Sequence, residues 1–226
     1  MPAPDSPALT APTAPASPAD QTAPVRPVDT AAIIEDLAYQ FDGIFSRDQV
    51  TAAVTGARDL LEPRSKIATF LPILITRHAK EQLTATAQAG GQLGRTVPEI
   101  LFVCVHNAGR SQMAAAIAAH LAPGKVHVRS AGSHPTGQVN PVAVEALHER
   151  GIDLTEAYPK PLSDSVVHAA DVIITMGCGD ACPVYAGKRY EDWDIPDPDG
   201  QPLPVLRDIR DNLTTRVSAL LRELNI

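Results

Sequence analysis

The chain has 226 residues, with 26 Asp and Glu against 19 Lys and Arg and a formal net charge of -7 at pH 7. This acidic balance argues against a protein that binds nucleic acid or a membrane surface, because both partners require a basic face. No apolar run reaches about 18 residues and no basic, apolar leader opens the chain, so we expect a cytoplasmic protein without a transmembrane helix. The three cysteines do not suit a secreted disulfide framework, and in a reducing compartment they favour metal binding or redox catalysis.

Composition divides the chain into four stretches. Residues 1–28 are dominated by Pro and Ala, which predicts a disordered extension. Residues 29–90 have the apolar periodicity of short helices, and the glycine-rich residues 91–97 read as a linker. Residues 98–226 alternate apolar strands with helices and form the second predicted domain.

The helical stretch predicts a small all-α three-helix bundle. Apolar side chains recur at three- and four-residue spacing over 30–41, 46–61 and roughly 65–88. Ser46 and Gln49 have the spacing of a capping box at the start of the second helix. Pro72 lies inside the third helix, so we expect a kink or a restart there.

The last stretch, residues 98–226, predicts an α/β domain. Strands are expected over 99–105, 126–132 and 170–177, and helices over 111–122, 140–151, 163–169 and 204–224. This alternation implies a parallel sheet that is covered by helices on both faces. Active sites of such sheets lie beyond the carboxyl ends of the strands, which is where Cys104 falls.

Cys104 and Arg110 form a Cys-x5-Arg motif between a strand and a helix, and Ser111 follows directly. Such a loop can wrap around an oxyanion with its backbone N–H groups, while the helix N-terminus and the Arg110 fork add positive charge. The same field favours a Cys104 thiolate, the nucleophilic form. A buried strand-end cysteine beside an incidental arginine is the alternative. The expected oxyanion-binding residues are Val105, His106, Asn107, Ala108, Gly109, Arg110 and Ser111.

The stretches FVCVHNAGRSQMA, RSAGSHP, NPVAVEAL, PKPL and WDIPDP occur in the order found in the low-molecular-weight protein tyrosine phosphatase superfamily. Within it, the chain is most similar to the thioredoxin-coupled arsenate reductases. The resemblance implies a four-stranded parallel sheet flanked by helices, and the helical stretch resembles three-helix domains fused ahead of such reductases. Two positions depart from the family. Gly109 stands where a second loop cysteine is common, and Ala115 stands where some relatives have a glutamate that helps to hold potassium.

The acidic loop EDWDIPDPDG contains the Asp-Pro pair that supplies the general acid in the family. The resemblance therefore assigns to Asp197 the protonation of an oxygen that leaves the tetrahedral centre as Cys104 attacks. Asp194 and Asp199 compete with it on distance alone. A solvated acidic turn without a catalytic role is the alternative.

Cys178 and Cys182 follow the 170–177 strand in Cys-x3-Cys spacing. Zinc would require about four ligands, which this stretch does not offer, and a permanent disulfide disagrees with a reducing compartment. Burial of both thiols disagrees with a stretch rich in Gly, Asp and Pro. A redox pair remains, and the family places its resolving cysteines after this same strand.

Together these features predict reduction of arsenate to arsenite, with Cys104 as nucleophile, Cys178 and then Cys182 as resolving thiols, and a thioredoxin-like reductant. A tyrosine or small-ester phosphatase is the first alternative, and an oxyanion-binding or redox-sensing regulator is the second. We expect no cofactor, no metal, and neither nucleic acid nor a membrane as partner. Glutathione or mycothiol as reductant, and a homodimer through the helical domain, stay open.

Overall fold

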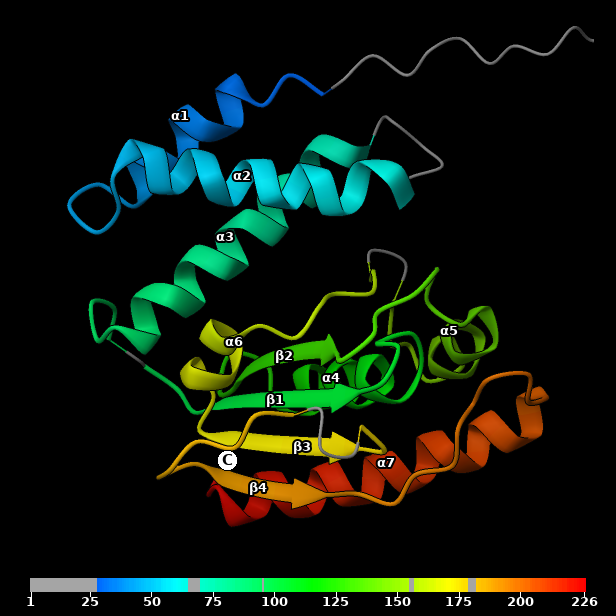
Figure 1. Ribbon diagram of the computed structural model, residues 1–226. Helices are drawn as coiled ribbons and strands as arrows, with labels where there is room; N and C mark the ends of the chain where they lie inside the picture. The colour runs from blue at the N-terminus through cyan, green and yellow to red at the C-terminus, as the bar shows by residue number, and fades with distance from the viewer. Residues whose placement is uncertain (1–27, 65–69, 95, 155–156, 179–181) are drawn as a thin grey trace, which may run out of the picture.

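The computed structural model describes residues 28–64, 70–94, 96–154, 157–178 and 182–226. The expected disordered extension lies outside these residues except for its last position. Among the described residues, no helix combines the length and the apolar character needed to cross a membrane. Figure 1 shows a helical unit stacked on one side of a sheet whose other side is covered by further helices.

The helical unit contains α1 (Ala31–Gln40), α2 (Arg47–Leu61), a short 3₁₀ turn (Glu62–Arg64) and α3 (Leu71–Ala89). The predicted capping box is present, because the Ser46 side chain accepts from Gln49 N–H and the Gln49 side chain accepts from Ser46 N–H. The described part of the third helix begins at Leu71, with Pro72 in its first turn, where a missing N–H costs nothing. The predicted start at 65–69 lies outside the described residues.

The described residues form one parallel sheet with the order β2-β1-β3-β4, as the resemblance implied. The strands are β1 (Glu99–Cys104), β2 (His127–Gly132), β3 (Val172–Met176) and β4 (Arg189–Asp192). The short edge strand β4 was not predicted from the pattern, because its residues are polar and none is fully buried. Cys104 closes β1 and is flanked in register by Gly132 and Met176, which close the neighbouring strands.

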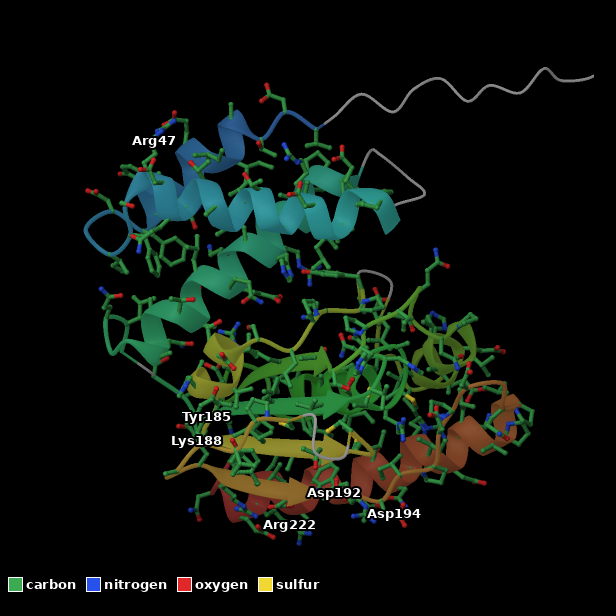
Figure 2. The ribbon with its side chains drawn as sticks, viewed as in Figure 1. Arg47, Tyr185, Lys188, Asp192, Asp194 and Arg222 are labelled. Atoms are coloured by element: carbon green, nitrogen blue, oxygen red, sulfur yellow. The ribbon has the colours of Figure 1, made fainter. Side chains whose placement is uncertain are left out.

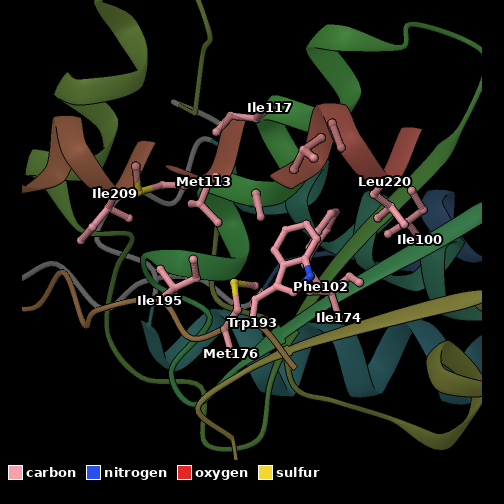
Figure 3. Close-up of a cluster of buried hydrophobic side chains, with 14 of the residues drawn as sticks. Ile100, Phe102, Met113, Ile117, Ile174, Met176, Trp193, Ile195, Ile209 and Leu220 are labelled. Carbon is pink, nitrogen blue, oxygen red and sulfur yellow. The ribbon is translucent and has the colours of Figure 1, made fainter. Parts of the chain in front are cut away.

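Four helices surround the sheet, namely α4 (Arg110–Leu121), α5 (Pro141–His148), α6 (Asp164–Ala169) and α7 (Leu203–Glu223). Alternate residues of β1 face opposite sides, as the strand period requires. Ile100, Phe102 and Cys104 pack in the apolar cluster that includes α4, α5 and α7, whereas Leu101 and Val103 pack in the cluster that includes α6. In the first cluster Phe102 lies against Trp193, with ring centroids 5.9 Å apart (Figure 3).

The helical unit is joined to the sheet along α3, which packs against α6. Ala85 of α3 is fully buried in the α6-side cluster. The guanidinium of Arg129, only 4 % exposed, pairs with the buried Glu99 and donates to the carbonyl of Glu81 at 3.0 Å. Breaking a buried pair of this kind leaves an uncompensated charge, which typically costs about 3–5 kcal/mol.

Candidate active site

Cys104 lies at the carboxyl end of β1 with its sulfur held by polar groups. The Ser111 hydroxyl lies 3.0 Å from Sγ, and the backbone N–H of Asn107 donates to Sγ at 3.2 Å. The Asn107 side chain donates to Ser111 Oγ at 2.8 Å, so these residues form a closed network around the thiol. The sulfur is thus held in place by one backbone donor and one hydroxyl.

The loop after Cys104 turns its carbonyl groups away from its interior. The carbonyls of Cys104, Val105, His106 and Ala108 accept from the N–H groups of Ser133, His134, Thr136 and Asn140. With the carbonyls bonded outward, the N–H groups of the loop are directed inward, as an oxyanion cradle requires. Helix α4 begins at Arg110 directly after the loop, so its N-terminus adds a positive dipole end.

Arg110 is 9 % exposed and reaches from α4 towards the acidic loop. Its Nη2 donates to Asp197 Oδ2 at 2.9 Å, and its Nη1 donates to the carbonyl of Ile195 at 3.4 Å. Gly177 permits this placement, because a Cβ there would lie 3.0 Å from Arg110 Nη1. Of the three acidic candidates, Asp197 is therefore the carboxylate that contacts Arg110 and so the anion loop, residues 104–111.

A cavity of about 620 Å³ opens between the anion loop, the start of α5 and the acidic loop. Of the expected oxyanion-binding residues, His106, Ala108, Gly109 and Arg110 line it together with Cys104. Val105, Asn107 and Ser111 do not line it, although the last two contact the Cys104 sulfur. Asp197 and Asp199 also line the cavity, whereas Asp194 does not.

Cys178 and Cys182 are both buried, at 7 % exposure each, contrary to the expectation that their stretch excludes burial. They pack in the α6-side cluster with Leu101, Val103 and Ile173, on the sheet face opposite to Cys104. This apolar surface provides the burial that the local composition does not indicate. All three cysteines are free thiols.

Burial determines the ionisation of the two downstream thiols. It raises the pKa of Cys178, and the charges of Asp192 and Cys104 raise it further against two backbone hydrogen bonds. Burial and the neighbouring Cys178 raise the pKa of Cys182 to about 11. Both groups are therefore protonated near neutral pH in this conformation.

Three residues of the site, Asn140, Gly132 and Gln112, were not singled out from the sequence. Asn140 connects three segments: it caps α5 by accepting from Val142 N–H at 2.8 Å, donates its backbone N–H to Ala108, and donates Nδ2 to the Pro198 carbonyl at 3.1 Å. Gly132 gives the anion loop its space, because a Cβ there would lie 2.7 Å from the Val105 carbonyl. Both lie within quoted motifs, but the motifs alone did not show these contacts.

Gln112 also supports the loop from α4. Its Nε2 donates to Oδ1 and to the backbone carbonyl of Asn107, at 3.0 and 3.1 Å.

Within the described residues, no group of three or more His, Cys, Asp or Glu side chains is placed to hold a metal ion.

Comparison with known proteins connects this geometry to named relatives. A protein from Halobacterium salinarum, named a putative arsenate reductase, is 37 % identical over 129 residues, which cover 55 % of this chain and 91 % of the relative. A glutaredoxin arsenate reductase from Synechocystis is 35 % identical over 130 residues, which cover 56 % of this chain and 98 % of the relative.

The solved structure of a thioredoxin-dependent arsenate reductase from Corynebacterium glutamicum is similar over both units. It is 41 % identical, covers 86 % of this chain and 95 % of its own, and has a TM-score of 0.77. Residues 31–87 match the model of a protein-tyrosine-phosphatase-like N-terminal domain. Residues 99–226 match the model of low molecular weight phosphotyrosine protein phosphatases. The chain belongs to the low molecular weight phosphotyrosine protein phosphatase family.

Proposed function

We propose that this chain reduces arsenate to arsenite with its three cysteines. One observation carries the proposal. Cys104 is the last residue of β1, and Met176 of β3 is its register partner. Cys178 lies two residues after Met176, so a second thiol follows the neighbouring strand. A hydrolase requires only the first thiol, whereas a reductase must supply two electrons from further thiols. The names and the identity of the relatives support the same reaction.

The first step uses the groups that converge on the cavity. Arsenate binds to the loop N–H groups and Arg110, and the Cys104 thiolate attacks arsenic. Asp197 donates a proton to a departing oxygen, which leaves as water, so a sulfur–arsenic(V) bond replaces an oxygen–arsenic bond. Arg110 already contacts Asp197. An arsenate bound to this guanidinium would therefore lie beside the proposed acid.

The second step needs Cys178 to leave its apolar contacts. Cys178 attacks Cys104 Sγ, a disulfide forms, and the electron pair of the sulfur–arsenic bond stays on arsenic, which departs as arsenite. Cys178 must first move from its apolar cluster to the side of the sheet that holds Cys104, where it is less buried and more readily ionised. Gly177, with φ of +71°, precedes it and supplies a backbone position that can change conformation.

The third step returns the site to its starting state. Cys182 attacks Cys178, which releases the Cys104 thiolate and leaves a Cys178–Cys182 disulfide. An external dithiol of the thioredoxin class then reduces this disulfide by exchange. The cycle consumes arsenate and two thiols and yields arsenite, water and one disulfide. We place it in the cytoplasm, where such reductants are maintained.

The test is turnover of the purified full-length chain with arsenate, NADPH, thioredoxin and thioredoxin reductase. We expect NADPH oxidation that depends on arsenate and matches the arsenite formed. Replacing thioredoxin with glutathione and glutaredoxin, or with mycothiol and mycoredoxin, identifies the reductant. Absence of arsenite with all three systems, from enzyme that still hydrolyses an aryl phosphate, would refute the proposal in favour of a phosphatase.

A further inference from the structure

A short segment, Tyr158–Lys160, lies between the helical unit and the anion loop. On the loop side, the backbone N–H of Lys160 donates to Asn107 Oδ1 at 2.8 Å. The carbonyl of Tyr158 accepts from Gln112 Nε2 at 2.8 Å. The segment is therefore bonded to two residues that hold the Cys104 network in place.

The same segment is held on its other side by α3. Lys160 Nζ pairs with Glu81 Oε2 at 3.2 Å, and the side chains of the pair are 17 % and 31 % exposed. The Tyr158 hydroxyl lies 3.4 Å from His78 Nδ1, and its ring meets the His78 ring edge at a centroid distance of 6.0 Å. Tyr158 also packs against the apolar core of the helical unit.

Asn107 makes this connection chemically relevant. It is fully buried and has φ of +50°, a conformation that costs a non-glycine residue roughly 1–2 kcal/mol unless its surroundings hold it. Oδ1 accepts from Lys160 and Gln112, and these bonds fix the side chain. In this conformation the Asn107 N–H donates to Cys104 Sγ at 3.2 Å. Loosening of Oδ1 thus weakens a donor to the nucleophile.

We infer that Glu81 is a positioning residue for the anion loop, acting through Lys160 and Asn107 on Cys104. The helical unit then contributes to the reactivity of the thiol as well as to the stability of the fold. This inference rests on the proposed role of Cys104 as nucleophile. It does not depend on whether the substrate is arsenate or a phosphate ester.

The experiment compares full-length variants that each remove one charge. Glu81→Gln and Lys160→Met break the pair between α3 and the segment. Glu35→Gln is the matched control, because Glu35 pairs with Arg47 within the helical unit, on an exposed surface away from the sheet (Figure 2). A charge exchange, Glu81→Lys with Lys160→Glu, restores an attractive pair with opposite polarity.

The first readout is alkylation of Cys104 by iodoacetamide as a function of pH, without arsenate. Trypsin releases Cys104 alone in the peptide 96–110, so mass spectrometry separates it from the other two thiols. Because the Asn107 N–H donates to Cys104 Sγ, we expect Glu81→Gln and Lys160→Met to move the midpoint to higher pH. At neutral pH, the alkylation rate of Cys104 should fall about threefold, which corresponds to the loss of a partly exposed ion pair.

The charge exchange should restore the midpoint towards that of the wild type, and Glu35→Gln should leave it unchanged. Unaltered alkylation in both Glu81→Gln and Lys160→Met would overturn the inference, and so would an equal shift in Glu35→Gln. Thermal unfolding of each variant identifies a variant that is merely unfolded. In that case the alkylation midpoint of the charge-exchange variant tests the inference. A wild-type chain that fails to reduce arsenate but shows these shifts would refute the proposed function and leave this inference standing.

Discussion

Arg110 Nη2 lies 2.9 Å from Asp197 Oδ2, so the clamp for the oxyanion and the proposed general acid share one hydrogen bond. The contact joins α4 to a loop that lies far away in the sequence. Arg110 is almost fully buried, whereas the Asp197 carboxylate is 54 % exposed at the cavity. The acid can therefore rotate towards a bound anion while the guanidinium stays fixed.

Replacing Asp197 with Asn should lower kcat for arsenate reduction by about 10²-fold, because a positioned acid typically contributes that much or more. The amide keeps the size of the side chain and can no longer donate the proton. Arg110 loses its ionic partner and becomes more available to an anion, so KM for arsenate should not rise. Steady-state kinetics with excess thioredoxin measure both constants.

The matched control for this substitution is Asp199→Asn. Asp199 lines the same cavity but has no contact with Arg110 among those described above. We expect its kcat to stay within about threefold of that of the wild type. If kcat fell as far in Asp199→Asn as in Asp197→Asn, the assignment of Asp197 as the general acid would be wrong.

Serine substitutions at the three cysteines should separate the steps of the relay. Cys104→Ser should form no arsenite, because the nucleophile is gone. Cys178→Ser should also form none, but it should still hydrolyse an aryl phosphate, because the loop and the acid are intact. Cys182→Ser should form a single equivalent of arsenite and then stop with a Cys104–Cys178 disulfide. Arsenite chromatography and mass spectrometry of the tryptic disulfide measure these outcomes.

Multiple turnovers by Cys182→Ser with thioredoxin would show that the reductant attacks the first disulfide directly. Undiminished turnover by Cys178→Ser would exclude the relay altogether. The double variant that lacks both downstream thiols is the control, and it should retain only hydrolysis.

Local patterns in the sequence determine part of this fold. The order of strands and helices, the capping box at Ser46 and the position of Cys104 at a strand end all follow from short-range periodicity and spacing. The edge strand β4 did not follow, because a polar, half-exposed strand has no apolar pattern to reveal it. The roles of the site residues and the domain boundaries remain predictions.

Contacts between distant segments could not be predicted from the sequence. The burial of Cys178 and Cys182 depends on apolar residues of β1 and α6, which their own stretch does not contain. The contact of Lys160 with Asn107 joins residues 53 positions apart. Gly109 read as a missing second thiol, whereas the structure gives it a steric reason, since a Cβ there would lie 2.4 Å from Pro198 Cγ.

The relay should speed up with rising pH. Burial raises the pKa of Cys178, whose attack releases arsenite, so its thiolate fraction is small at neutral pH and grows as pH rises. Aryl phosphate hydrolysis does not use this thiol and should not show this increase. Single-turnover arsenite release, measured by rapid quench from about pH 6.5 to 9, tests the difference. Parallel profiles for the two reactions would contradict a rate-limiting downstream thiol.

Gly109→Ala should displace the general acid Asp197 without unfolding the protein. The added methyl group meets the Pro198 ring at 2.4 Å, and relief of this clash displaces the loop that contains Asp197. Displacement of a catalytic group by about 1 Å can cost 10²-fold, so we expect kcat to fall by about 10- to 100-fold. Gly94→Ala, with no atom within 4 Å of its added Cβ, is the control and should be unchanged. Normal kcat in Gly109→Ala would show that the loop accommodates the methyl group.

His78 should make the fold sensitive to mild acid. Burial lowers its pKa from 6.5 to about 4, with Glu81 opposing this effect and Lys160 adding to it. The Tyr158 hydroxyl also faces the ring, at 3.4 Å from Nδ1. Between these two pKa values the unfolded chain binds a proton that the folded chain does not. Stability is therefore lost as pH falls through this window, by about 2 kcal/mol at about pH 5.

His78→Gln removes the titrating group and keeps a polar side chain opposite the Tyr158 hydroxyl. Urea unfolding at about pH 7.5 and about pH 5 should show a stability loss in the wild type that is smaller, by about 2 kcal/mol, in this variant. His148→Gln is the matched control, because His148 is exposed at the end of α5 and its loss should leave the pH dependence unchanged. An undiminished acid response in His78→Gln would place the sensitivity in other groups, because the buried imidazole is then not what the unfolded chain protonates.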